Sequence, residues 1–102
     1  MNPREIRIRL LRVAEDDLAE ILAYIASDSP IAAESLLTKF EKNLILLSEH
    51  PRLGRIPEEE ELTRLGYRYL VIDKYLLFYT VEGQTVCVHR ILHGARNYLP
   101  LL

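Results

Sequence analysis

Three short apolar segments follow one another so closely that they constrain the fold more than any other feature of the chain. Residues 67–72, 75–82 and 85–93 are rich in tyrosine, valine, isoleucine and phenylalanine, which favour strands. Links of only two residues, 73–74 and 83–84, separate them, and two-residue links are typical of β-hairpins. A helical crossover does not fit into such links, so the segments predict three adjacent antiparallel strands.

The first half of the chain changes its hydrophobic period once. Residues 5–13 alternate between apolar and polar side chains, which predicts a strand. Apolar residues at helical spacing then predict two helices, over 14–27 and 29–50, joined by a very short connection. A loop with at most one helical turn follows over 51–66. The order β-α-α-β-β-β predicts an α+β fold in which a two-helix hairpin packs on one face of an antiparallel sheet.

Length and composition predict one domain, residues 1–102. The chain is 49% hydrophobic and 27% charged, a profile typical of soluble globular proteins. No apolar run reaches the roughly 18–20 residues that span a bilayer, and no signal peptide is recognisable, so we expect a cytoplasmic protein. Cys87 is the single cysteine and has no partner for an internal disulfide.

Pairing Ile72 with Tyr75 and Glu82 with Thr85 assigns the strand residues to two faces of the sheet. One face holds Arg68, Leu70, Tyr75, Leu77, Tyr79, Val88 and Arg90, and the other holds Tyr67, Tyr69, Val71, Leu76, Phe78, Cys87, His89, Ile91 and His93. Both faces are apolar. We therefore expect one face to pack on the helices and the other to await a partner.

The candidates for chemistry on these strands are few. Cys87, His89 and His93 could suggest a metal, but Cys87 and His93 lie roughly 20 Å apart on an extended strand, so we expect no metal and no cofactor. Arg68 and Arg90 could bind RNA phosphates or could pair with acidic side chains of the same protein. RNA cleavage without a metal needs a general acid, a general base and a cation, and His93 with these arginines could supply them.

The motifs of the chain resemble those of a known family. Residues 75–98 end in Arg90-Ile91-Leu92-His93-Gly94, followed by Arg96 and Tyr98, and the helical half is followed by Pro-x-Leu-Gly-Arg over 51–55. This order resembles the RelE/ParE superfamily of bacterial toxins over nearly the whole chain. The resemblance implies the toxin of a type II toxin-antitoxin, or plasmid stabilisation, module. It also implies a small antitoxin as partner, with Leu77, Tyr79 and Val88 as its expected contacts.

The superfamily contains two activities. ParE-like members inhibit DNA gyrase by binding it, and the ending of this chain resembles theirs, so Arg90, His93, Arg96 and Tyr98 are the expected target contacts. RelE-like members cleave messenger RNA on the ribosome, which would make His93, Arg90 and Arg68 catalytic. The lysine cluster of RelE-like sites is missing, since Lys74 stands alone in a turn. A third alternative keeps the fold but makes the chain an inactive binding module.

Overall fold

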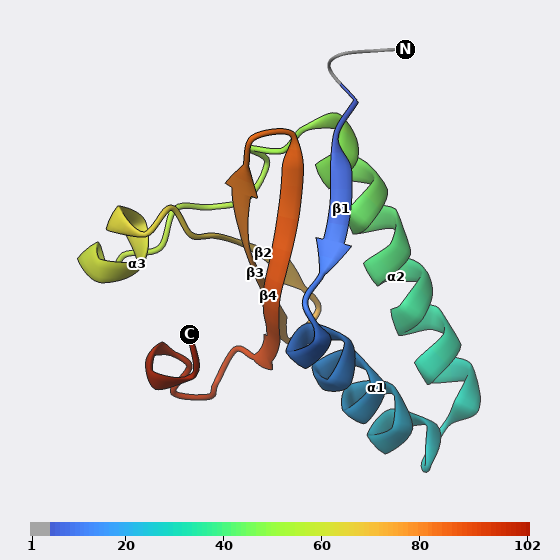
Figure 1. Ribbon diagram of the computed structural model, residues 1–102. Coiled ribbons are helices and arrows are strands. Elements are labelled where there is room, and N and C mark those ends of the chain that lie inside the picture. Colours follow the sequence, from blue (N-terminus) through green and yellow to red (C-terminus); the bar gives the residue numbers. More distant parts are fainter. Residues whose placement is uncertain (1–4) are drawn as a thin grey trace.

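The computed structural model describes residues 5–102, which form a four-stranded sheet with two long helices on one face (Figure 1). The elements in chain order are β1 (Arg7–Leu10), α1 (Arg12–Ala26), α2 (Pro30–Glu49), α3 (Glu60–Arg64), β2 (Arg68–Ile72), β3 (Tyr75–Glu82), β4 (Thr85–His93) and the 3-10 helix η1 (Leu99–Leu101). The α+β class and the order of the main elements are confirmed.

The sheet is mixed, although the sequence predicted an antiparallel one. Strands β2, β3 and β4 are antiparallel neighbours as expected, but β1 joins the far edge of β4 and runs parallel to it. Parallel neighbouring strands need a long connection, and the helices with strands β2 and β3 supply it between β1 and β4. The strand order is therefore β1-β4-β3-β2.

Local signals place both ends of α2, whereas α1 begins at Arg12, inside the predicted strand 5–13, after Leu11, whose side chain provides no cap. Ser29 caps α2, since its Oγ accepts a hydrogen bond from the Ala32 N–H at 3.2 Å, and Pro30 occupies the first turn. The helix ends at Glu49, before Pro51. The apolar stripes of both helices pack on the sheet in one core, whose buried members are Ala14, Leu36, Phe40, Leu47, Leu70, Ile72, Leu77, Tyr79, Val86, Val88 and Ile91.

Both hairpins have the predicted register at their turns, but β4 contains a bulge. Phe78 pairs with Arg90 whereas Tyr79 pairs with Val88, so His89 is an extra residue in β4. The extra residue reverses the alternation beyond it, because the side-chain period of a strand is two. Arg90 therefore moves to the face of Phe78, and Ile91 moves to the helix-covered face, opposite to the predicted assignment.

The second face of the sheet is partly covered by the chain itself. In Figure 1, α3 and the C-terminal segment lie on the side of the sheet away from the long helices. Leu62 of α3 joins Tyr67, Phe78 and Leu92 in a second core cluster, with Tyr98, Leu101 and Leu102 packed against it. The prediction that a whole apolar face awaits a partner is wrong for this part of the sheet. No helix among residues 5–102 is both long and apolar enough to cross a membrane.

Candidate functional site

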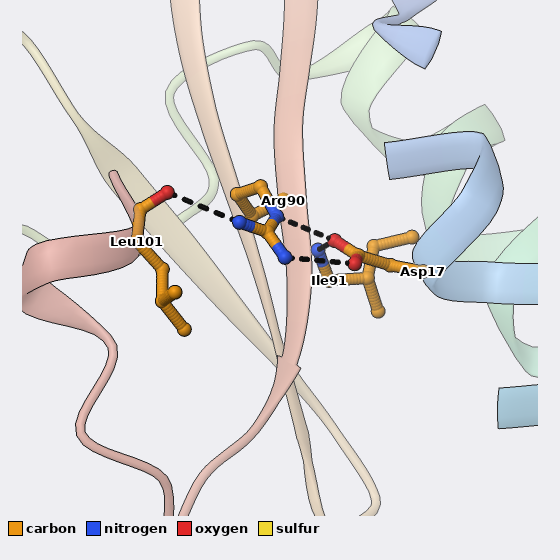
Figure 2. A network of polar contacts seen from close by, with 4 residues as sticks. All are labelled: Asp17, Arg90, Ile91 and Leu101. Atoms are coloured by element: carbon orange, nitrogen blue, oxygen red, sulfur yellow. Dashed lines mark hydrogen bonds and ion pairs between the residues drawn. The ribbon is translucent and has the colours of Figure 1, made fainter. Parts of the chain in front are cut away.

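Arg90, a predicted target contact, is held inside the protein by an acidic residue of α1. Its Nε and Nη2 donate to the two carboxylate oxygens of Asp17 at 2.8 and 2.9 Å, and its Nη1 donates to the Leu101 carbonyl at 3.1 Å (Figure 2). The side chains of Arg90 and Asp17 are only 16% and 11% exposed. The hydrogen bonds to Asp17 raise the pKa of Arg90. Most of its hydrogen-bonding capacity is used in joining β4 to α1 and the C-terminal segment.

The same carboxylate stabilises the distorted part of β4. Asp17 Oδ2 also accepts the backbone N–H of Ile91 at 3.0 Å, just beyond the bulge. Strand β1 ends at Leu10, opposite Val88, so β4 has no strand neighbour on that side at Ile91. Asp17 thus supplies the acceptor that a longer β1 would have provided.

Arg68, the other predicted phosphate-binding arginine, holds the loop that follows α2. Its Nη1 donates to the carbonyl oxygens of Gly54 and Arg52 at 3.0 and 3.3 Å. The Gly54 N–H donates to the buried hydroxyl of Tyr79 at 2.8 Å, and a side chain at Gly54 would begin only 2.6 Å from the Tyr79 ring. The Pro-x-Leu-Gly-Arg motif therefore fastens the loop to the sheet, a role that sequence reasoning missed.

His93 and Arg96 are the predicted residues that remain exposed at the end of β4. The His93 ring meets the Tyr75 ring edge-on, with centroids 5.7 Å apart, and lines a groove between the helical hairpin and the β2–β3 turn. The Arg96 N–H donates to the His93 carbonyl, so one tight turn carries both side chains. Within residues 5–102 the guanidinium of Arg96 forms no hydrogen bond or ion pair.

Tyr98 attaches the C-terminal segment to the second face. Its hydroxyl donates to the Glu59 carboxylate at 2.7 Å, and its ring packs on Phe78 with centroids 4.8 Å apart. The hydrogen bond to Glu59, with burial, raises the pKa of Tyr98 to about 12. Its hydroxyl is therefore already engaged within the protein's own fold.

The three residues of the predicted ribonuclease site do not converge. Arg68 pairs with Tyr79 on β3 while His93 pairs with Tyr75, four residues away, which is about 13 Å along a strand. The third residue, Arg90, lies on the opposite face from Arg68, contrary to the prediction that they share one. Both guanidinium groups also have partners within the protein.

The predicted antitoxin contacts are buried. Leu77, Tyr79 and Val88 are 1%, 0% and 0% exposed, and all belong to the core under the long helices. A direct contact with them would require the helices to move off the sheet. They therefore offer no free surface in this structure.

A polar cluster on the second face is another feature that sequence reasoning missed. The Thr80 hydroxyl lies 2.9 Å from His89 Nε2 and donates to Glu82 at 3.1 Å, and the Tyr67 hydroxyl lies 3.4 Å from His89 Nδ1. Burial lowers the pKa of His89. Burial, with a hydrogen bond to Glu82, raises the pKa of the neighbouring Cys87 thiol. The signals in the sequence were Cys87 and His89 at alternate positions and the predicted pairing of Glu82 with Thr85, which brings the acid close to them.

Comparison with known proteins identifies the family. The family described as the ParE toxin of the type II toxin-antitoxin system parDE matches residues 8–98. The chain belongs to the ParE toxin family. This ParE-family chain is also 31% identical over 80 residues to Toxin RelE2 of Caulobacter vibrioides, which covers 78% of this chain and 85% of the relative. It is a toxin of a type II toxin-antitoxin system within the RelE/ParE superfamily, and its family implies an antitoxin partner.

A solved structure has the same fold as this ParE-family toxin. It is described as the chromosomal ParDE TA system from P. aeruginosa. The TM-score is 0.71 at 20% identity, and the match covers 88% of this chain and 97% of the other. The mixed sheet with its helical hairpin is thus shared at low sequence identity.

Proposed function

We propose that this ParE-family toxin inhibits DNA gyrase by binding it through the turn after β4, with His93 and Arg96 as contacts. Gyrase acts on DNA inside the cell, so the proposal places the toxin in the cytoplasm. Of the four target contacts predicted from the sequence, Arg90 and Tyr98 act as positioning residues in this proposal. They hold the C-terminal segment that leads out of the turn.

The observation that carries the proposal is that some arginine side chains are bonded within the part of the chain that the structure describes, whereas Arg96 is not. Arg90 and Arg68 bond to groups of the protein itself, whereas Arg96 is exposed and has no side-chain partner among residues 5–102. Catalysis of RNA cleavage needs a cation held near the acid and base, and neither Arg68 nor Arg90, the two arginines predicted as catalytic, is held beside His93. An exposed His–Arg pair on a tight turn instead suits recognition of a protein surface.

The ribonuclease alternative retains one supporting observation, the relative named Toxin RelE2. In that alternative the target is messenger RNA on the ribosome and His93 transfers a proton. The two activities predict different first effects in a growing cell.

Controlled expression without antitoxin separates these alternatives. We expect thymidine incorporation to fall before methionine incorporation, and purified toxin to block supercoiling by gyrase. A first fall in methionine incorporation, with cleaved messenger RNA, would favour the ribonuclease. No effect on either would point to an inactive binding module.

Variants of the turn test its role. Arg96→Ala should weaken gyrase inhibition about tenfold or more, since arginine is enriched among the interface residues whose truncation costs about 2 kcal/mol or more, and about 1.4 kcal/mol is tenfold. Arg64→Ala is the matched control, because Arg64 is also exposed and lies at the end of α3, away from the turn. Equal inhibition by both variants, with both proteins folded, would exclude the turn as the gyrase contact.

A further inference from the structure

We propose that Glu82, Cys87 and His89 form a binding site for a zinc-class divalent cation on the second face of the sheet. A carboxylate oxygen, the Cys87 Sγ and a ring nitrogen of His89 lie within 4.8 Å of one another. This set differs from the one considered from the sequence, because Glu82 of the neighbouring strand takes the place of the distant His93. The hairpin between β3 and β4 brings it there.

The backbone of the hairpin holds the three ligands in place. Glu82 pairs with Thr85 at the turn and Cys87 pairs with Thr80, so both lie on well-ordered parts of the ladder. His89 is the bulged residue of β4 and projects onto the same face, where its ring contacts Tyr67 and Thr80. Without the bulge, His89 and Arg90 would not both lie on this face.

The three ligand atoms lie at most slightly farther apart than the ligands of a zinc ion do. Two ligands of a tetrahedral zinc ion with bonds of about 2.1–2.3 Å lie about 3.5 Å apart. Since the ligand atoms lie within 4.8 Å of one another, each pair needs to approach by at most about 1.3 Å. Glu82 is exposed, so a change of its rotamer can bring its carboxylate closer to the Cys87 Sγ and to the ring nitrogen of His89.

The surrounding hydrogen bonds are those that orient a metal-binding histidine. Metal-bound histidines usually donate their other ring N–H to an oxygen of the protein. The Tyr67 hydroxyl is 3.4 Å from His89 Nδ1, and the two rings meet nearly edge-on with centroids 4.9 Å apart. Binding of the cation at Nε2, which faces Thr80 and through it Glu82, would place the ring proton on Nδ1 and would replace the hydrogen bond between Nε2 and the Thr80 hydroxyl.

The chemistry of the three donors selects the class of cation. Sulfur, imidazole nitrogen and carboxylate oxygen together suit zinc and similar transition metals, whereas magnesium and calcium prefer oxygen alone. A thiolate and a carboxylate would also balance the two positive charges. Tyr67, Thr80, Glu82 and His89 line an open pocket, so a water molecule can reach the fourth position.

Cobalt(II) is the probe for the test, because a bound thiolate gives it a charge-transfer absorption that hydrogen-bonded thiols lack. We expect one cobalt ion per full-length toxin with this absorption, and displacement by zinc. Cys87→Ser should abolish the absorption, and Glu82→Gln should weaken zinc affinity about tenfold or more. Because Glu82 is exposed, the second variant keeps the test valid if Cys87→Ser fails to fold.

His93→Gln is the matched control, since His93 is exposed and lies at the other end of the β3–β4 pair. Its metal affinity should equal that of the unmodified toxin. The proposal is overturned if the toxin shows no thiolate absorption with cobalt. It is equally overturned if Glu82→Gln binds zinc as tightly as the unmodified chain.

Discussion

The two faces of the sheet are covered by different kinds of element. The first is covered by α1 and α2, of 15 and 20 residues, over a core that includes Phe40. The second is covered by the five-residue α3 and the C-terminal segment, over a smaller cluster around Phe78. Polar groups such as His89 and Thr80 lie beside that smaller cluster.

The two coverings indicate where stability and function can reside in so small a protein. The first face has its apolar surface buried between long elements that pack along their whole length, which supplies most of the hydrophobic stabilisation. The second face depends on a few specific bonds, among them those of Arg90 and Tyr98. Surfaces held by few contacts are the ones that can change for recognition without loss of the fold.

A matched pair of core truncations gives the largest expected effect. The two rings are equally buried, at 1% and 0% exposed. Even so, Phe40→Ala should destabilise the toxin by about 4–5 kcal/mol and Phe78→Ala by about 3 kcal/mol. The short α3 and the C-terminal segment can move into the space left by Phe78, whereas long helices relax little. Urea denaturation measures both values. A larger loss for Phe78→Ala would show that the second face contributes more to stability than the first.

Removal of the guanidinium of Arg90 comes next. Arg90→Met should cost about 3 kcal/mol, because the carboxylate of Asp17 stays buried without its cation. The double variant Asp17→Asn with Arg90→Met should recover part of that loss, again by urea denaturation. If Arg90→Met instead keeps its stability but loses toxicity, Arg90 is a target contact and its ion pair is incidental.

The smallest expected effect concerns the hydroxyl of Tyr98. Its pKa in the folded protein is about 12, above the ordinary value of 10.0, so its bond to Glu59 stabilises the fold fully below pH 10. That contribution is lost as the pH rises from 10 towards 12. Ultraviolet titration of the tyrosines should show a component near pH 12 that Tyr98→Phe removes. Tyr24→Phe, at a side chain that is 80% exposed, should leave that component in place.

Local patterns in the sequence were sufficient for the order of the long helices and the strands and for both hairpin turns, although β1 occupies only Arg7–Leu10 of the predicted strand 5–13. Ser29 with Pro30 marks one helix start, and the positive φ of 63° at Gly83 is the conformation for which a glycine in a two-residue turn is suited. These features depend on neighbours a few residues away. The order of the motif residues at the end of β4 was likewise sufficient to indicate the toxin family.

The roles of those motif residues depend on contacts between elements far apart in the sequence. Two polar residues stand in succession between Val88 and Ile91. This break in the apolar–polar alternation of β4 could have indicated the bulge. The partner of Arg90, however, is Asp17, 73 residues earlier in the chain. Pairing of β1 with β4 likewise joins segments that no periodicity relates. Periodicity reports which side of its own element a residue occupies, whereas contacts between elements depend on how the whole chain packs.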